Sequence, residues 1–213
     1  KLGELVSIAT TSYDAYHYAQ ALQETESFFW TRFTDTYLEL AKPRARAFED
    51  GAVGEEAAAS GSAVATLRLG LSVLLRLLAP VLPYITEEIW SWCLAEEHVG
   101  GGGFAARTIH RAPWPGAADF RDIEAPAHAD SFDVAVTALA AVNKAKADAS
   151  VSMGRAVRSL VLASSPQARV VLEGVADDVL AAARVDGHAL ESDDALEPGV
   201  IEVRAIEFAT REA

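Results

Sequence analysis

Apolar residues recur every three or four positions through most of the first 115 residues, with polar residues between them. This spacing puts the apolar side chains on one face of a helix, so it predicts a series of amphipathic helices. The first helix is predicted over residues 4–27. We expect its inner face to carry Tyr13, Tyr16, Ala19 and Leu22.

The next stretch, over about residues 28–48, is rich in aromatic residues and predicts a second helix. Its apolar positions keep a helical phase and indicate one buried face, formed by Phe29, Phe33, Tyr37 and Leu40. Charged residues stand between them. Pro43 is expected to end or bend this helix, because proline lacks the amide proton and clashes with the preceding turn.

Small and acidic residues over 51–62 predict a loop, after which Ser62 is expected to cap a third helix. That third helix is apolar on nearly every side, as expected for the central element of a bundle. Pro80 and Pro83 then interrupt the chain, and Thr86 is expected to be the N-cap of a fourth helix.

Four glycines at 100–103 are expected to end the fourth helix in a turn. The segment 107–115 contains too much proline for a helix, so it is expected to pack as an extended strap. A change of composition over 116–127 then indicates the boundary of a domain.

The tail of the chain mixes two periods. Helical spacing predicts helices over 132–149 and 167–184, whereas alternation of apolar and polar residues predicts strands over 156–163 and 200–208. This combination is typical of a small α/β unit.

The predicted fold class is therefore mainly α, a helical bundle followed by a small α/β subdomain. The predicted domains are the bundle over 1–115, a linker over 116–131 and the α/β subdomain over 132–213. With 51% hydrophobic residues, the chain can bury a substantial core. No initiator methionine is present, so Lys1 is expected to be the first residue of an excised piece.

The formal net charge of −13 argues against a nonspecific nucleic-acid binder. Positive charge is nevertheless concentrated in two segments, with a net +2 over 32–46 and a net +3 over 144–158. Cys93 is the single cysteine, which excludes an internal disulfide and fits a reducing compartment. No apolar run is expected to be long enough to span a membrane, so we expect no membrane association.

No arrangement of residues in the sequence indicates a catalytic or metal centre. The five histidines do not pair at the spacing of metal ligands. Glu87 and Glu88 are adjacent, but at the start of a helix they are explained by the helix dipole. The glycine run lacks the lysine of a phosphate loop. We therefore expect no catalytic residue and no metal site.

A recognition surface is the remaining candidate, because guanidinium groups bind phosphate and exposed aromatic rings stack on unpaired bases. The candidate basic contacts are Arg32, Lys42, Arg44, Arg46 and Arg68, with Tyr37 or Phe48 as the stacking residue. Arg76 lies on the same helix as Arg68 and could line the same end of the bundle. Ion pairing within the bundle, for example between Arg32 and Asp35, would explain the same residues.

Three segments resemble the valyl-tRNA synthetase family. Residues 29–42 (FWTRFTDTYLELAK) resemble its aromatic helix, residues 74–90 (LLRLLAPVLPYITEEIW) resemble a segment shared by the valine, isoleucine and leucine enzymes, and residues 110–115 (HRAPWP) resemble the valyl enzymes. The tail, including residues 143–146 and 151–153, is similar to the same family more weakly.

This resemblance implies the anticodon-binding region of a class Ia synthetase, in which a helical bundle grips the anticodon stem-loop of tRNA(Val). Separate catalytic and editing domains of the parent chain would activate valine with ATP, charge the tRNA and remove mischarged product. The catalytic signatures His-Ile-Gly-His and Lys-Met-Ser-Lys-Ser are absent here. The chain is therefore expected to bind tRNA without a cofactor of its own, as a cytoplasmic monomer.

Two other readings stay open. The same bundle could come from an isoleucyl-tRNA synthetase, although residues 37–39 and the HRAPWP segment favour the valine enzyme. An acidic helical module that binds protein and not RNA would fit the net charge. Thr34 and Thr36 also stand where the family often has cysteine and tryptophan, so no stacking role carries over to Thr36.

Overall fold

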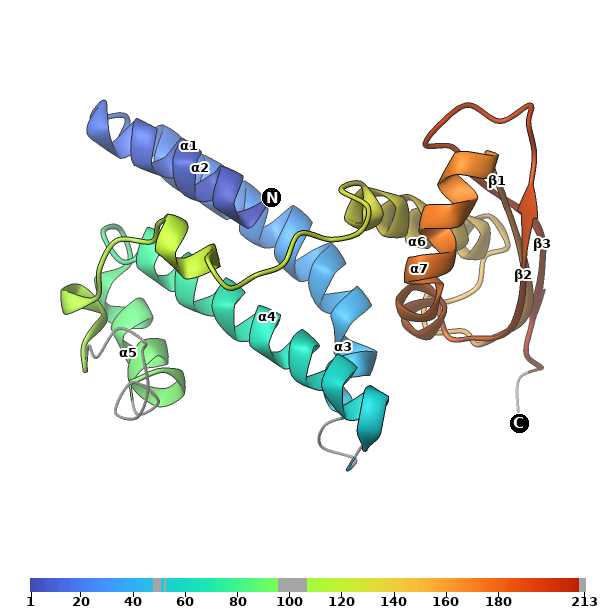
Figure 1. The fold of residues 1–213 in the computed structure, drawn as a ribbon, viewed down its shortest axis with the longest axis horizontal. Coiled ribbons are helices and arrows are strands. Elements are labelled where there is room, and N and C mark those ends of the chain that lie inside the picture. Colours follow the sequence, from blue (N-terminus) through green and yellow to red (C-terminus); the bar gives the residue numbers. More distant parts are fainter. Residues whose placement is uncertain (48–50, 52, 96–106, 211–213) are drawn as a thin grey trace. The chain divides into compact units, whose positions relative to one another are not determined.

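The computed structural model describes residues 1–47, 51, 53–95 and 107–210, which form two compact units (Figure 1). The first unit combines Lys1–Leu38 with Gly51–Ile123, and the second combines Glu39–Asp50 with Glu124–Ala213. The division by contacts thus assigns residues 39–50 to the second unit, which the sequence did not suggest.

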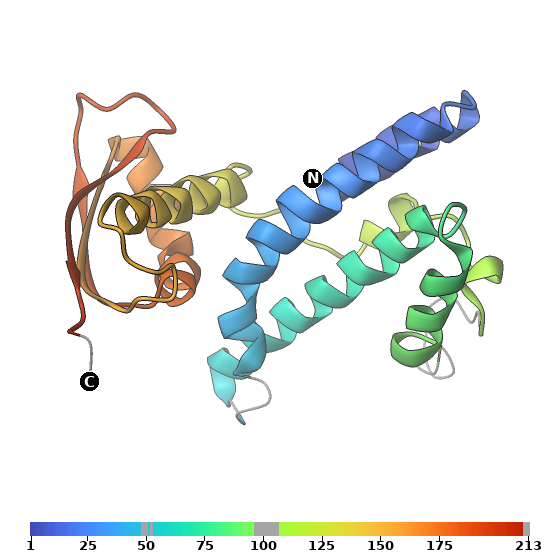
Figure 2. The ribbon, with the colours of Figure 1, turned by 180° about the vertical axis from the view of Figure 1, so that it is seen from behind.

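The first unit begins with helices α1 (Leu2–Asp14) and α2 (Tyr18–Ser27), which lie side by side as a hairpin (Figures 1 and 2). The prediction of one helix over 4–27 was wrong. Tyr16 has a positive φ of 61°, and the amide of His17 donates to the carbonyl of Ser12 (2.8 Å), which closes the end of α1.

The inner face of this hairpin also differs from the prediction. Ala9 and Ala21 are fully buried, and such small side chains let two helices approach closely. Tyr16 is 77% exposed and Ala19 is also exposed, because the turn removes both from the predicted helical phase.

The aromatic segment forms a π-helix, η1 (Phe28–Leu38), which continues into α3 (Glu39–Arg46). The predicted second helix is therefore present, but its first part has the wider turn of a π-helix. Pro43 does not end it, since α3 continues to Arg46.

The longest helix, α4, spans Gly54–Leu78, so the predictions of a loop over 51–62 and of a cap at Ser62 were wrong. Alanines give this stretch a high helix propensity, and Glu55 and Glu56 occupy the first turn, where carboxylates complement the helix dipole. Ser62 lies inside the helix and its carbonyl accepts a hydrogen bond from the hydroxyl of Thr66 (2.9 Å).

By length and composition α4 is also apolar enough to cross a membrane, with a mean hydropathy of 1.5. The expectation of no such segment was wrong, because it counted only uninterrupted apolar runs. The core helix of a soluble protein passes the same test. In the first unit Val73, Leu74 and Leu77 of α4 are buried against Leu5, Val6 and Ala9 of α1.

Helix α5 spans Pro83–Cys93 and begins directly at Pro83, a favourable first position for proline. Thr86 therefore lies one turn inside the helix and is not its N-cap, since its hydroxyl donates to the carbonyl of Leu82 (2.8 Å). The predicted break at Pro80 and Pro83 is confirmed. The predicted turn at glycines 100–103 lies outside the described residues.

The strap, residues 107–115, contains one short 3₁₀ helix, η3 (Ile109–Arg111), and is followed by a second, η4 (Ala117–Phe120). Ile109 is buried together with Trp90 and Leu75, which anchors the strap on α4 and α5. Glu87 of α5 accepts hydrogen bonds from the amide of Ile109 and the hydroxyl of Thr108, both at 2.8 Å. Glu87 is therefore explained by this structural role.

The second unit contains five further elements. They are α6 (Ser131–Asp148), β1 (Val157–Ser164), α7 (Pro166–Ala183), β2 (Val185–Ser192) and β3 (Ile201–Phe208). The two helices and the two strands predicted from the sequence are confirmed. β2 was not predicted, because Gly187 and polar residues interrupt its alternation.

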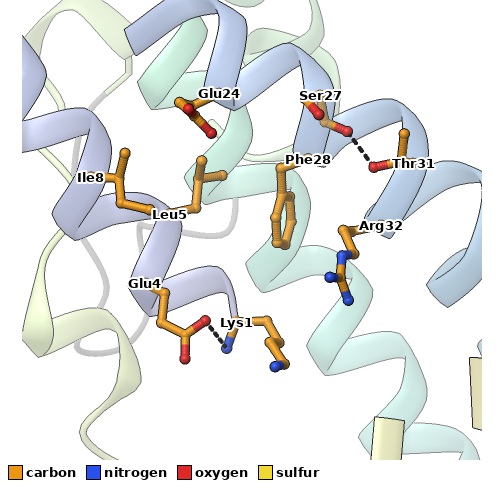
Figure 3. Close-up of a pocket in the computed structure, with 9 residues that line it drawn as sticks. All are labelled: Lys1, Glu4, Leu5, Ile8, Glu24, Ser27, Phe28, Thr31 and Arg32. Atoms are coloured by element: carbon orange, nitrogen blue, oxygen red, sulfur yellow. Dashed lines mark hydrogen bonds and ion pairs between the residues drawn. The ribbon is translucent and has the colours of Figure 1, made fainter. Parts of the chain in front are cut away.

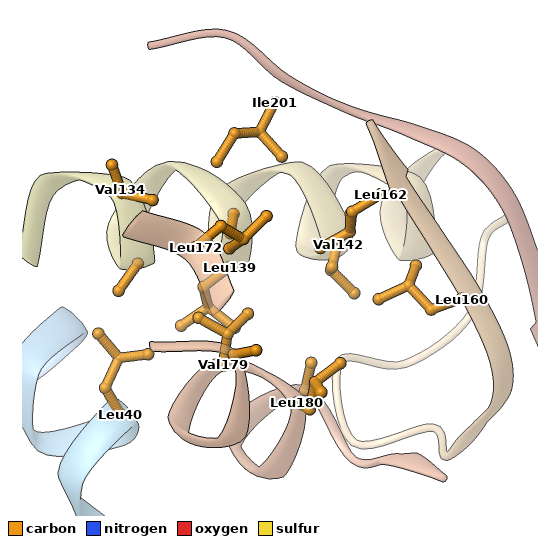
Figure 4. Packing of buried hydrophobic residues seen from close by; sticks show 14 of the residues in the cluster. Leu40, Val134, Leu139, Val142, Leu160, Leu162, Leu172, Val179, Leu180 and Ile201 are labelled. Atoms are coloured by element: carbon orange, nitrogen blue, oxygen red, sulfur yellow. The ribbon is translucent and has the colours of Figure 1, made fainter. Parts of the chain in front are cut away.

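The three strands form one sheet in the order β2-β1-β3, with β1 parallel to β2 and antiparallel to β3. The apolar side chains of α6, α7 and the sheet share one core (Figure 4). Leu40 of α3 belongs to this core, which is the reason that α3 groups with the second unit. The predicted fold class, a helical bundle with a small α/β subdomain, is confirmed.

Candidate nucleic-acid interface

The π-helix η1 carries two of the predicted RNA-binding residues, Arg32 and Tyr37. Its wide turn is matched by threonine hydroxyls that donate five residues back, from Thr34 to the carbonyl of Phe29 and from Thr36 to that of Thr31 (both 2.8 Å). In an α-helix such back-bonds reach three or four residues. The two threonines therefore support the local geometry of η1.

Tyr37 is half-buried and stacks on Phe33, with ring centroids 6.1 Å apart and planes at 22°. Phe33 in turn packs against the core formed by α1 and α4. One face of the Tyr37 ring is thus occupied within the protein, so Tyr37 is poorly placed to stack on a base with that face.

Trp30 is the aromatic residue of η1 that the prediction missed as a candidate. Its side chain is 56% exposed, and its ring meets Phe29 edge to face at 4.9 Å. In the phase of an α-helix Trp30 lies at the edge of the apolar face and not opposite it, so its exposure is a finding of the structure. Arg32 lies two residues further along η1, a spacing at which helical side chains point to different faces, so η1 carries both an exposed ring and a guanidinium without placing them in contact.

Arg32 is exposed and lines a cavity of about 230 Å³ between α1, α2 and η1 (Figure 3). Lys1, Glu4 and Glu24 also line it, and the terminal amine of Lys1 lies 3.9 Å from the Glu4 carboxylate. The cavity therefore combines charges of both signs and is not a simple phosphate site. Arg32 contributes its guanidinium to this cavity from η1.

Arg68 and Arg76 of α4 have different environments. Arg68 is exposed, and its Nη2 donates to the carbonyl of Cys93 at the end of α5 (3.1 Å), an acceptor that a helix leaves unpaired. Arg76 is only 3% exposed and lies 2.5 Å from Asp119. The expectation that Arg76 lines a binding surface was wrong, because its buried guanidinium pairs with Asp119 and is not exposed to a ligand.

The three basic candidates of α3 belong to the second unit. Lys42 pairs with Glu39 of the same helix (3.3 Å), and Arg44 pairs with Asp178 of α7 (3.1 Å). Burial raises the pKa of the Asp178 carboxyl, although the nearby Arg44 charge acts in the opposite direction. Arg44 therefore helps to hold α3 on α7.

Arg46 is exposed and has no ion pair or side-chain hydrogen bond with any residue that the structure describes. Phe48, the other predicted stacking residue, lies outside the described residues. The candidates are thus divided between the units: Arg32, Tyr37 and Arg68 belong to the first, and Lys42, Arg44 and Arg46 to the second.

Within the described part of the chain, no group of three or more His, Cys, Asp or Glu side chains could hold a metal ion. The candidate residues of this interface are cations and aromatic rings, which bind nucleic acids through charge and stacking.

Among known families, residues 1–161 match the model described as the anticodon-binding domain of tRNA ligase. The chain belongs to this family. The match covers every described element of the first unit, together with α3, α6 and the beginning of β1 in the second. Arg32, Trp30 and Arg46 lie within the matched region, so we interpret them as residues of an anticodon-binding domain.

Similar curated proteins carry the name valine–tRNA ligase. The protein of Leifsonia xyli is 38% identical over 185 residues, which is 87% of this chain and 19% of that protein. The protein of Thermobifida fusca is 38% identical over 200 residues, 91% of this chain and 20% of that protein. The chain thus spans about a fifth of the length of these relatives, and the resemblance to valyl-tRNA synthetases is confirmed.

Proposed function

We propose that the chain recognises the anticodon stem-loop of tRNA(Val) as part of a valine–tRNA ligase. The family match over residues 1–161 carries this proposal, and the names of the relatives support valine as the amino acid. The alternative of an isoleucine enzyme is not favoured by these relatives.

The parent enzyme would activate valine with ATP and transfer it to tRNA(Val) in catalytic and editing domains that lie outside this chain. The described residues include no metal-ligand cluster, and we assign no cofactor to this part of the protein. We further propose that the parent acts as a cytoplasmic monomer. The role of this chain is then to bind the tRNA and hold its anticodon.

The structure suggests how the contacts are divided. Arg46 and Arg32 are exposed cations suited to backbone phosphates, which supply most of the affinity and all of its strong salt dependence. Trp30 presents an exposed ring to an unpaired base. Arg44 joins α3 to α7 and Arg68 joins α4 to α5, so we assign them supporting roles, and we assign the same role to Lys42, which pairs with Glu39.

The test measures binding of a valine-type anticodon stem-loop to the 213-residue chain by fluorescence anisotropy at several salt concentrations. A stem-loop with a changed central anticodon base is the comparison, and we expect it to bind about tenfold or more weakly, the loss of about 1.4 kcal/mol or more expected for a lost base contact. Equal affinity for the two stem-loops, or no binding at low salt, would contradict the proposal.

Trp30→Ala tests the stacking assignment. We expect it to weaken stem-loop binding by about 1–3 kcal/mol, the usual loss when an aromatic partner of a base is removed. Trp92→Ala is the matched control, because Trp92 is an exposed tryptophan (73%) on another helix, α5. Equal effects of the two substitutions would remove Trp30 from the proposed interface.

A further inference from the structure

The second unit contains a cavity of about 390 Å³ at the end of the sheet where α6 leads into β1. We call it the Arg155 pocket, and its lining residues are Ser150, Val151, Ser152, Gly154, Arg155, Ala156, Ala209 and Thr210. They come from the α6–β1 connection and from the end of β3. The polar groups of this lining are one guanidinium and three hydroxyls.

These polar side chains are available to a ligand. Within the described residues, Arg155 makes no ion pair, and the hydroxyls of Ser150, Ser152 and Thr210 make no hydrogen bond. Arg155 is half-buried, whereas the three hydroxyl residues are exposed at the rim. Among the described residues no carboxylate pairs with this half-buried guanidinium, and leaving it without an acceptor is costly unless a ligand or water satisfies it.

Two other cations, Lys146 and Arg184, hold the α6–β1 connection that lines the pocket. Lys146 is fully buried, and its Nζ donates to the carbonyls of Met153 (2.9 Å) and Ala183 (2.7 Å). Arg184 follows α7 and donates from Nη1 to the carbonyl of Gly154 (3.2 Å). These bonds tie the α6–β1 connection to the end of α7, so Arg155 is presented on a held loop.

The segment that contains the α6–β1 connection has an excess of positive charge on an acidic protein. Residues 144–158 carry a net +3, whereas the whole chain carries −13. The local cations offset the negative ends of the α6 and α7 dipoles, which would otherwise repel an anion. A positive region confined to one place on an acidic protein favours a polyanion that binds there specifically.

We infer that the Arg155 pocket binds a backbone phosphate of RNA, with Arg155 as the charged donor and Ser150, Ser152 and Thr210 as hydroxyl donors. Arginine and hydroxyl side chains are common partners of phosphate oxygens, and such contacts position a nucleic acid without reading its sequence. The inference extends the proposed function, because the contact lies outside the helical bundle and would be made to the same tRNA.

The experiment compares Arg155→Gln with the unchanged 213-residue chain, using a full-length tRNA transcript over a range of salt concentrations. Loss of one phosphate contact reduces the magnitude of the slope of log K against log salt by about 0.7–0.9. At 0.1 M salt this corresponds to about a fivefold to eightfold loss of affinity. Arg155→Lys should restore much of the slope. Ser152→Ala should weaken binding less than Arg155→Gln.

Arg169→Gln is the matched control. Arg169 is an exposed arginine of the same unit, and it pairs with Glu173 on α7 (2.8 Å), away from the pocket lining. The control removes the same charge, so a general electrostatic effect would appear in both variants. Equal slopes for Arg155→Gln and Arg169→Gln would overturn the inference.

A second measurement separates this inference from the proposed function. Titration of the chain with inorganic phosphate, followed by NMR, should shift the amide signals of residues 150–156 and 209–210. Discrimination between the two anticodon stem-loops tests the proposed function and should be unchanged by Arg155→Gln. Phosphate shifts without any loss of tRNA affinity in Arg155→Gln would overturn the RNA assignment.

Discussion

A Cβ atom added to Gly70 would lie 2.3 Å from Cε2 of Phe33, so the absence of a side chain on α4 creates the seat for this ring. Phe33 carries the stacked ring of Tyr37, and both belong to η1. The conformation of the aromatic π-helix therefore depends on one glycine of the neighbouring helix.

We expect Gly70→Ala to destabilise the first unit by about 1–3 kcal/mol, the usual cost of overpacking a core. Urea unfolding followed by tryptophan fluorescence reports on this unit alone, because Trp30, Trp90, Trp92 and Trp114 all belong to it. Gly61→Ala on the same helix is the control. No atom lies within 4 Å of its added Cβ, so it should be neutral or stabilise by up to about 1 kcal/mol.

The ion pair between Arg76 and Asp119 fastens the segment after the strap to α4. Arg76 also donates to the carbonyls of Ser72 (3.1 Å) and Pro113 (3.3 Å), so its buried charge is surrounded by acceptors. We expect Arg76→Met to destabilise the first unit by about 3–5 kcal/mol, because it leaves the Asp119 carboxylate buried without its partner.

The check is a double-mutant cycle with Asp119→Leu in the same fluorescence assay. The double variant should lose less stability than the sum of the single variants, since neither charge is then left alone. Arg121→Met, which removes an exposed arginine next to η4, should change stability by less than about 0.5 kcal/mol. Strict additivity of Arg76→Met and Asp119→Leu would contradict this account.

Lys146 should make the stability of the second unit depend on pH. Burial, and secondarily the charge of Arg184, lowers the pKa of Lys146 below its ordinary value of 10.5. Between the lowered pKa and 10.5 the unfolded chain binds more protons than the folded chain, so stability rises with pH across this window. Below the window both states are protonated and this dependence disappears.

Lys146→Met should abolish that rise and also destabilise the unit, because the carbonyls of Met153 and Ala183 lose their donor at a cost of about 1–3 kcal/mol each. Urea unfolding can be followed by NMR of the Val142 and Leu160 methyl groups, which lie in this core. Lys144→Met, at an exposed position of the same helix, should keep the rise. A rise that persists in Lys146→Met would refute the assignment.

Substitutions of Arg44 and Arg46 should affect different properties, the first the stability of the second unit and the second the binding of tRNA. Arg44→Gln removes the partner of the partly buried Asp178, so we expect it to destabilise the second unit by about 1 kcal/mol or more. Arg46→Gln should leave the free energy of unfolding unchanged. It should reduce the magnitude of the slope of log K for tRNA binding against log salt by about 1, the contribution of one phosphate contact. The reverse pattern, with Arg46 stabilising the fold and Arg44 silent, would contradict the assigned roles.

The elements that the sequence predicted well are those whose periodicity comes from burial on one face. α6, α7, β1 and β3 all pack on a single core, so their apolar positions repeat regularly. The failures have local causes. The left-handed turn at Tyr16 has no glycine to mark it, and the helix over residues 54–62 consists of small residues that also suit loops.

The candidate site was predictable in composition but not in arrangement. The basic residues lie on η1, α3 and α4, within the helices expected from the sequence, but Arg44 and Arg76 have partners in distant parts of the chain. Asp178 follows Arg44 by more than a hundred positions, and Asp119 follows Arg76 by 43. Trp30 was missed because its neighbours in the sequence suggested a buried aromatic cluster.

The assignment of α3 to the second unit has a consequence for biosynthesis. The chain enters that unit at Glu39, leaves it at Gly51 and returns at Glu124. On the ribosome, α3 is made before α6 and α7, so Leu40 and Arg44 acquire their partners only after those two helices have emerged. Neither unit is thus a contiguous stretch of translation, and a protein ending at Ile123 would expose an apolar and charged face of α3 that α6 and α7 cover in the 213-residue chain.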